Sequence, residues 1–455
     1  MLEERIHFYH INDLHSHFEH WQRIDQFIHD RKGWHGDAGE EMIVMDLGDH
    51  IDRFHPYTEA LLGKGNVELL NKLGCQYATI GNNEGITFPY ETLDALYNEA
   101  NFKVLVANLY DRKGKRPNWT LPYCIHETKK GTRIALIGAT AYFRIFYETL
   151  GWRITEPLEE IRKAVDEVKE EADSIILLSH LGLEYDELLA KELPELTIIF
   201  GAHTHHILHE GKMVAGTLLC GAGKGGVYVG HVEMTMDGRK HPAALEARLY
   251  NMNEQKPVNG EKAFAKSLYE IGKEKLSAEV CRLPEALKAD WFKESPLPVL
   301  LCETLREWCD ADCAFLPAGL LLDGLSAGEV TIHDLHRICP HPINPCVVEL
   351  KGTELKEVLL QSTAEEWPHM QVKGFGFRGN ILGRMIYSRI TMNGPYEIWI
   401  GDERLQANQT YRLALPDMFT FGFFFPTIKR TEKKMYYLPE FLRDLLMNKL
   451  QEAYR

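Results

Sequence analysis

Five short apolar segments in the first half of this chain are each followed by aspartate, histidine or asparagine, and this pattern constrains the fold more than any other feature. The strands expected there cover residues 6–11, 42–47, 77–80, 174–178 and 196–200. The polar side chains that follow them are Asp13, His15, Asp49, Asn82, His180, His203 and His205. Ligands bind beyond the carboxyl ends of the strands in an open α/β sheet. We therefore expect these side chains to share one site.

The segments between these strands have helical periodicity, which predicts an α/β fold for the first half. The further strands and helices expected there are 104–107 and 133–137, and 66–73, 90–100 and 158–172. After about residue 250 the regular alternation ends, and 261–276 is typical of an amphipathic connecting helix. We expect an N-terminal domain at 1–252, a linker helix and hinge at 253–290, and a C-terminal α+β domain at 291–455.

The residue types at the strand ends favour a metal site. Imidazole nitrogens with carboxylate and amide oxygens suit divalent cations of borderline hardness, so Mn²⁺, Zn²⁺ and iron are all compatible. Asp49 is the natural bridging ligand because Gly48 before it permits close approach. Two such metals activate a water and stabilise the attacking and leaving oxygens of a phosphoryl displacement. The hypothesis is therefore metal-assisted hydrolysis of a phosphate ester.

The order and spacing of these residues resemble the five motifs of calcineurin-like metallophosphoesterases. The motifs are Asp13-x-His15, Gly48-Asp49, Gly81-Asn82, His180 and His203-x-His205. The second half is similar to the C-terminal domain of bacterial 5'-nucleotidases and 2',3'-cyclic phosphodiesterases. The segments that carry this second resemblance are 327–331, 340–344, 350–355 and 407–413.

The resemblance implies a four-layer α/β/β/α metallophosphoesterase sandwich with a second α+β domain at the C-terminus. It also implies two divalent metal ions. One would be held by Asp13, His15, Asp49 and His205. The other would be held by Asp49, Asn82, His180 and His203. A small-molecule phosphoester, most naturally a nucleotide, is the implied substrate.

The third motif departs from the family, which usually has a histidine and an aspartate that form a dyad beside the phosphate. Asn83 and Ile86 occupy those two positions here. An amide donates a hydrogen bond to phosphate but is not a general acid, and loss of a positioned acid costs about 10² to 10⁴ in rate. His50 and Arg53 are candidates to compensate, as proton donor and phosphate ligand. The alternatives are a surface or supporting role for His50 and a structural role for Arg53.

The C-terminal half also departs from the family. The arginine of the family's nucleotide-holding string is replaced by Leu322. Two aromatic rings usually clamp the base, and Phe375 or Phe377 with Phe419 or Phe424 lie in the corresponding neighbourhoods. A base stacks on any aromatic face. For the Phe-rich stretch 419–425, core packing is the competing interpretation.

Charge and cysteine content bear on partners and location. The net charge of −15 disfavours a nucleic-acid partner, because binding to phosphate backbones depends on basic side chains. Apolar runs fall short of a membrane span, the start lacks signal-peptide features, and the nine cysteines fit buried thiols. We expect a cytoplasmic protein without a membrane partner. The other hypotheses are a catalytically attenuated protein that binds metal and phosphate, and a nuclease of the same superfamily.

Overall fold

The computed structural model describes residues 4–394 and 396–454. The chain divides into two compact units, Met1–Gly272 and Lys273–Arg455. The division falls inside the segment 253–290 that the sequence suggests as a linker. Each unit has its own sheets and its own core.

Two sheets form the centre of the first unit. One sheet has the order β15 (Pro242–Asn251), β14 (Tyr228–Met236), β1 (Glu4–Ile11), β2 (Glu41–Asp46), β3 (Tyr77–Ala78), β4 (Lys103–Leu105) and β6 (Thr120–Leu121). The other has the order β12 (Lys212–Val214), β13 (Thr217–Cys220), β11 (Leu196–Gly201), β10 (Ser174–His180), β8 (Arg133–Thr140) and β7 (Tyr123–Glu127). A short pair, β5 (Leu109–Tyr110) and β9 (Arg153–Ile154), lies apart from both.

Alternating side chains on the strands build two apolar layers. Ile43 and Met45 of β2 pack with Ile176 and Leu178 of β10 in one core cluster, which fills the space between the sheets. The intervening residues of β10 face the other way and join a second cluster with residues of two helices. A strand that is buried on both faces has apolar residues at nearly every position, and these strands have such runs in the sequence.

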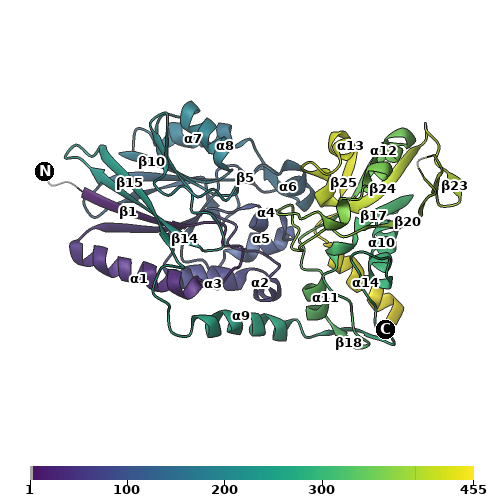
Figure 1. Ribbon diagram of the computed structural model, residues 1–455. Helices are drawn as coiled ribbons and strands as arrows, with labels where there is room; N and C mark the ends of the chain where they lie inside the picture. Colours follow the sequence, from purple (N-terminus) through teal and green to yellow (C-terminus); the bar gives the residue numbers. More distant parts are fainter. Residues whose placement is uncertain (1–3, 395, 455) are drawn as a thin grey trace. The chain divides into compact units, whose positions relative to one another are not determined.

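Helices cover the outer faces of this unit. α1 (Trp21–Ala38) lies over one sheet, and α7 (Pro157–Val168) and α8 (Leu183–Glu192) lie over the other (Figure 1). The remaining helices of the unit are α2 (Pro56–Leu61), α3 (Lys64–Leu73), α4 (Asn82–Ile86), α5 (Tyr90–Leu96), α6 (Arg144–Leu150) and most of α9 (Glu261–Lys275), which crosses the division between the units. The expected α/β/β/α order of layers is confirmed. One detail differs from the sequence interpretation: the polar strand ends come from two sheets rather than one.

The second unit is built on a mixed five-stranded sheet. Its order is β20 (Met385–Ser388), β17 (Cys313–Pro317), β24 (Thr410–Pro416), β19 (Pro345–Lys351) and β25 (Lys434–Tyr436). Smaller sheets pair β16 (Glu279–Leu283) with β18 (Gly328–Thr331), and join β21 (Ile390–Met392), β22 (Ile398–Ile400) and β23 (Glu403–Arg404). Its helices are α10 (Pro296–Trp308), α11 (Ile332–Ile338), α12 (Gly352–Ser362), α13 (Pro426–Arg430) and α14 (Leu442–Tyr454). This is the expected α+β class. Among the described residues, no helix combines the length and the apolar character that crossing a bilayer requires.

Candidate metal centre

The strand ends of the two sheets in the first unit deliver a cluster of imidazoles and carboxylates. One ligand atom each from Asp13, His15 and His205 lies within 4.8 Å of the others. The same holds for Asp13, Asp49 and His180. Asp13 and His15 follow β1, Asp49 follows β2, His180 ends β10 and His205 follows β11. The structure therefore brings together five residues that the sequence predicts as ligands.

Two carboxylates occupy the middle of this cluster. Asp13 Oδ1 lies 3.3 Å from His205 Nε2, 3.7 Å from His15 Nε2 and 3.9 Å from His180 Nε2. Asp49 Oδ2 lies 3.5 Å from His180 Nε2 and 3.7 Å from His15 Nε2. Both carboxylates thus face imidazoles on either side, whereas the sequence argument singled out only Asp49 as a bridge.

The other two predicted ligands lie beside these groups. The His203 ring is 5.3 Å from the His180 ring, and the His203 backbone N–H donates to Asp13 Oδ2 at 3.1 Å. Asn82 begins α4 directly after β3, and its Nδ2 lies 3.3 Å from Asn83 Oδ1. All seven predicted ligands therefore lie at the ends of β1, β2, β3, β10 and β11.

Two buried atoms of the cluster test whether a metal suits it. His180 Nδ1 donates to the Leu47 carbonyl at 2.7 Å, which leaves Nε2 aimed at the carboxylates. His180 Nε2 and Asn82 Oδ1 are buried, and neither makes a hydrogen bond of ordinary geometry with the described residues. Buried polar atoms are almost always satisfied, so an orphaned imidazole nitrogen and amide oxygen together fit ligands of a cation. The donor set fits a borderline divalent metal.

The backbone at the site is held in an uncommon conformation. The predicted ligands with positive φ are Asp13 (49°), His15 (49°), Asp49 (50°), His203 (72°) and His205 (57°). Residues other than glycine adopt the left-handed region at a cost, and such strain concentrates at functional sites. The surrounding loops must therefore hold these ligands firmly.

Glycines let two of these loops touch. A Cβ on Gly48 would come within 2.3 Å of the Gly81 nitrogen, and Gly48 also has φ of +87°. A Cβ on Gly81 would lie 2.0 Å from Asp49 Oδ1. Only glycine fits at both positions, which agrees with the close approach that the sequence suggests for Gly48.

A buried carboxylate, Glu84, ties the same loops together, and the sequence argument gave it no role. Its Oε2 accepts the backbone N–H groups of Asp49 and Gly81 at 2.9 and 2.8 Å, and its Oε1 accepts that of Ile51 at 2.9 Å. Burial and the neighbouring Asp49 carboxylate raise the pKa of Glu84 to about 7. The sequence does carry a signal for this role. Glu84 is the third residue of the helix that follows Gly81, and a carboxylate at that position commonly accepts the backbone N–H of the residue before the helix.

A glycine-rich loop, residues 221–226, holds the first ligand from the other side. Asn12 Nδ2 donates to the Gly223 carbonyl at 2.7 Å and to Asp13 Oδ2 at 2.8 Å, and Asn12 Oδ1 accepts the Ala222 N–H. The Gly225 N–H donates to the Asp13 carbonyl. The loop connects β13 to β14, as a turn between strands, and it fixes the orientation of Asp13.

The electrostatics of the cluster favour a cation. Burial opposes a charge on His180, yet the carboxylates of Asp49 and Asp13 outweigh it and raise the pKa of His180 to about 10. Burial would also raise the pKa of Asp49, but His180 and His15 hold it well below its ordinary value. Positive charge is thus stabilised here, and a metal ion that displaces protons from the imidazoles meets that demand.

The predicted catalytic residue Asn83 supports a ligand. It is buried, and its Nδ2 lies 2.9 Å from His15 Nδ1 and 3.1 Å from the Ile51 carbonyl. Its backbone N–H donates to Asp49 Oδ1 at 2.7 Å. Asp52 Oδ2 also lies 3.2 Å from His15 Nδ1. These contacts position His15 and Asp49.

The geometry around His50 and Arg53 favours their structural alternatives. His50 is buried, its ring packs edge-on against Trp21, and burial lowers its pKa to about 3. Arg53 makes a two-pronged ion pair with Glu59, at 2.7 and 2.8 Å, and donates to the Thr87 carbonyl at 2.6 Å. A histidine that stays neutral and a guanidinium already engaged are poor candidates for a proton donor and a phosphate ligand.

The two predicted base-stacking rings differ sharply in exposure. Phe419 is completely buried and packs against Phe315 and Phe425, so its ring has no free face for a base. For Phe419 the core-packing interpretation therefore fits the structure, because the short helix that carries it lies inside the second unit. Phe375 is 39% exposed and Phe423, which the sequence argument missed, is 66% exposed.

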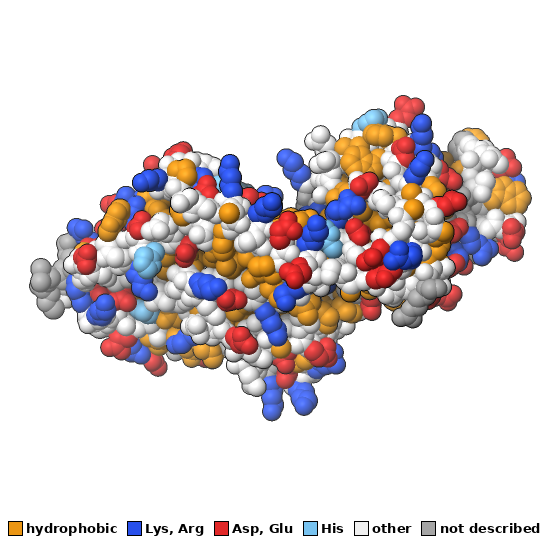
Figure 2. All heavy atoms as spheres, turned by 90° about the horizontal axis from the view of Figure 1, so that it is seen from below, with side chains coloured by type: hydrophobic (Ala, Val, Ile, Leu, Met, Phe, Trp, Pro, Cys, Tyr) orange, Lys and Arg blue, Asp and Glu red, His pale blue; other side chains and the backbone are white. Residues whose placement is uncertain are grey.

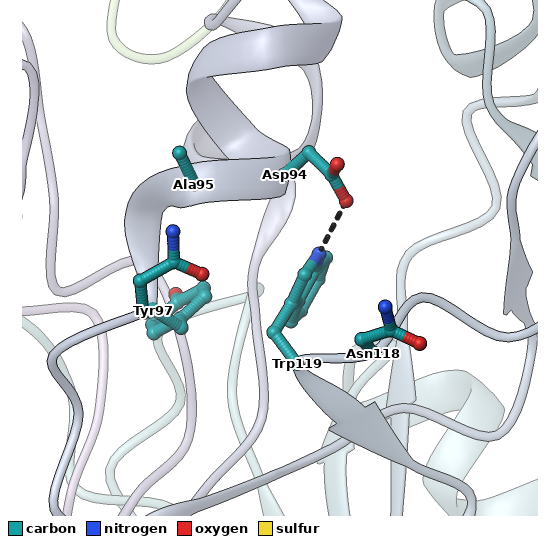
Figure 3. A pocket seen from close by; sticks show the side chains of 6 residues that line it. Asp94, Ala95, Tyr97, Asn118 and Trp119 are labelled. Atoms are coloured by element: carbon teal, nitrogen blue, oxygen red, sulfur yellow. Dashed lines mark hydrogen bonds between the residues drawn. The ribbon is translucent and has the colours of Figure 1, made fainter.

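A separate surface hollow in the first unit contains none of the predicted site residues. Its volume is about 380 Å³, and Asp94, Tyr97, Asn98, Asn118 and Trp119 line it together with an alanine. Figure 3 shows the Trp119 ring beside Asp94, to which its Nε1 donates at 3.3 Å. This contact occupies the polar edge of the ring, and we assign no ligand to the hollow.

Two family models match the chain. One described as calcineurin-like phosphoesterase matches residues 6–206, and one described as 5'-nucleotidase, C-terminal domain, matches residues 276–423. The first range contains every predicted metal ligand. The second range lies wholly within the second unit.

Relatives along the whole chain point the same way. A Bacillus subtilis protein named uncharacterized metallophosphoesterase YunD is 44% identical over 470 residues, covering 99% of this chain and 100% of the relative. A 5'-nucleotidase of Vibrio cholerae is 25% identical, covering 90% of this chain and 83% of the relative. A putative 5'-nucleotidase of Staphylococcus aureus, solved with α-ketoglutarate, has a TM-score of 0.72 at 18% identity, covering 99% and 97%.

Proposed function

Since this chain belongs to the calcineurin-like metallophosphoesterases that carry a 5'-nucleotidase C-terminal domain, we propose that it hydrolyses the phosphate ester of a nucleotide. Metal-dependent hydrolysis of a phosphoester is the activity of the family. We further propose which residues hold the metals, that the substrate is a nucleotide, and that the second unit binds the substrate. The observation that supports the proposal is His180 Nε2, which is buried between the carboxylates of Asp13 and Asp49 and makes no hydrogen bond with the described residues, as expected for a metal ligand.

Two divalent metals, of which Mn²⁺, Zn²⁺ and iron all suit the donors, would supply Lewis acidity and a water of lowered pKa. Asp13, His15, Asp49 and His205 would hold one, and Asp49, Asn82, His180 and His203 the other. Asn83 keeps the His15 ring in place, and Glu84 keeps the Asp49 loop against the Asn82 loop. Asn82 and Asn83 would orient the phosphate of the substrate.

The residues at the third motif bear on which ester is cleaved. Asn83 and Ile86 provide no acid to protonate a leaving oxygen. Esters whose leaving group departs without protonation should therefore react much faster than an alkyl phosphate such as AMP, by up to about 10² to 10⁴. We infer a preference for cyclic or otherwise activated phosphoesters within the nucleotide class.

The second unit, with the expected domain range 291–455, is the proposed substrate domain. Phe375 and Phe423 present exposed rings that a base could stack on, in place of the buried Phe419. On the face drawn in Figure 2, the described Lys and Arg side chains are interspersed with Asp and Glu. This mixture and the net charge of −15 support a small-molecule substrate over nucleic acid. The nine cysteines, all buried free thiols, support work in a reducing compartment such as the cytoplasm.

The test is turnover of bis-p-nitrophenyl phosphate, p-nitrophenyl phosphate, AMP and 2',3'-cyclic AMP with added Mn²⁺. Asp49→Asn should abolish turnover because it removes a carboxylate shared by the imidazoles of the cluster. Asp37→Asn, on the exposed side of α1, is the matched control and should behave like the unchanged protein. Equal rates for Asp49→Asn and the unchanged protein would refute the site. Turnover of the chromogenic esters without turnover of either nucleotide would refute the substrate class.

A further inference from the structure

A second cluster of imidazoles lies on the outer face of the first sheet, away from the strand ends. One ligand atom each from His7, His35 and His231 lies within 4.8 Å of the others. His7 is on β1, His231 is on β14, and His35 is in the last turn of α1. None of the three belongs to the candidate metal centre.

Strand register explains how these residues meet. His7 lies opposite Glu233, and Tyr9 lies opposite His231, in the antiparallel pair of β1 and β14. Side chains two apart share a face, so these four point the same way. The residues between them, Phe8 and Val232 among them, face the core between the sheets. His35 comes down from α1, which covers the outer face.

The nitrogens converge on each other and on a carboxylate. His7 Nδ1 lies 3.0 Å from His231 Nε2. Glu40 Oε2 lies 3.0 Å from both His7 Nε2 and His35 Nδ1. Glu233 Oε2 is 3.9 Å from His7 Nδ1. Two nitrogen ligands of a tetrahedral zinc ion lie roughly 3.3 Å apart. His7 Nε2 and His35 Nδ1 are each 3.0 Å from Glu40 Oε2, close to this spacing, and one nitrogen of each of the three imidazoles lies within 4.8 Å of the others.

Burial and protonation also suit a metal. The side chains of His7 and His231 are almost fully buried, and His231 Nδ1 makes no hydrogen bond with the described residues. Burial and the neighbouring His35 lower the pKa of His7, and burial and His7 lower the pKa of His231 to about 3. Metals bind the neutral imidazole. Glu40 is part-exposed, which leaves a way in for an ion.

We propose that His7, His35 and His231, with Glu40 as the fourth ligand, bind a third divalent metal ion of the zinc type. Three imidazoles and one carboxylate form a closed tetrahedral set that leaves no position for substrate, which is typical of a structural site. The ion would fasten the end of α1 and the start of β2 to the β1–β14 pair. The rings of His7 and His35 stack with centroids 3.7 Å apart, which brings the two side chains together.

The experiment measures Zn²⁺ bound at equilibrium by metal-stripped protein, for the unchanged chain, His35→Gln and His29→Gln. His29 is exposed on the same helix outside the cluster, so its replacement is the matched control. His35→Gln should bind about one ion fewer per chain than the other two proteins. Its turnover should be unchanged, which separates the loss from any failure of the catalytic site.

Glu40→Gln keeps all three imidazoles but removes the carboxylate ligand. It should weaken binding of the same ion by at least the roughly 10- to 100-fold that loss of a hydrogen-bond partner of a ligand costs. Zn²⁺ should also raise the unfolding temperature of the unchanged protein by more than that of His35→Gln, measured with the catalytic site saturated by Mn²⁺. If all the proteins bind the same number of Zn²⁺ ions with the same affinity, the cluster is a hydrogen-bonded packing motif and the proposal is wrong.

Discussion

Glu84 shows how much of the site depends on a single side chain that need not contact a metal. Its carboxylate accepts three buried backbone N–H groups from two loops. Glu84→Gln replaces one acceptor oxygen by a donor, so at least one N–H loses its partner, at a cost of about 1 to 3 kcal/mol. We expect that loss in urea denaturation, together with a lower kcat because the Asp49 loop is released.

The control for this substitution is Glu91→Gln, at an exposed position of α5. It changes the same functional group without touching a buried amide, so stability and kcat should stay as they are. A Glu84→Gln protein with unaltered stability would show that the two loops are held by other contacts.

Which imidazoles and carboxylates cluster at the strand ends could be predicted from the sequence, since each predicted ligand follows or ends a recognisable strand. What could not be predicted is where a side chain is already engaged. His50 and Arg53 have the right chemistry, but Trp21 packs against one and Glu59 pairs with the other. Phe419 likewise is an aromatic residue in the right segment whose ring is enclosed. Burial and pairing are properties of the folded chain.

Glycine is required at one loop position of this protein and dispensable at one helix position. Gly81→Ala would place a Cβ 2.0 Å from Asp49 Oδ1, so the loops must separate, and we expect loss of metal and of thermal stability. Gly33→Ala, inside α1, would meet no atom within 4 Å. It should stabilise the protein by about 0.5 to 1 kcal/mol, because alanine favours helix.

Metal content and thermal unfolding of the two variants provide the comparison. Full metal content in Gly81→Ala would contradict the close packing of the Gly48 and Gly81 loops.

Secondary structure of the first unit follows the sequence pattern closely. Every expected strand is present with ends shifted by a few residues, as for 133–137 within β8 (Arg133–Thr140). The sequences of these strands did not predict which of the two sheets each strand joins. Strands buried on both faces have the same apolar composition in either sheet, and only the family resemblance implied a sandwich. The histidine cluster was equally hidden, because His7 and His231 lie far apart in the sequence.

Buried neutral histidines make the stability of the whole molecule depend on pH. His341 in the second unit is buried, donates from Nε2 to the Leu320 carbonyl and accepts the Arg378 N–H at Nδ1. Burial and Arg378 lower its pKa to about 3 from 6.5. Between pH 6.5 and pH 3 the unfolded chain therefore binds a proton at His341 that the folded chain does not bind. The free energy of unfolding should fall as the pH drops through this range.

His341→Gln should flatten this dependence between pH 8 and pH 5, even if the variant is less stable at pH 8. His369→Gln, at an exposed position of the same unit, should leave the slope unchanged. Urea unfolding at a series of pH values gives the slope directly. A His341→Gln protein with the slope of the unchanged chain would mean that other groups set the acid sensitivity.

The contacts between Asp13 and the 221–226 loop also determine when the site can form while the chain is being synthesised. Asp13 and His15 leave the ribosome well before His205, the loop and β14, which lie about 190 to 220 residues further along the chain. Until then β1 has only one of its two neighbouring strands, and the Asp13 carbonyl lacks the Gly225 N–H that donates to it, although the Asp13 N–H can already donate to the Gly48 carbonyl. The nascent chain therefore completes the cluster of predicted ligands only after the loop emerges, and a product truncated before the loop lacks the contacts from residues 221–226 that fix the orientation of Asp13.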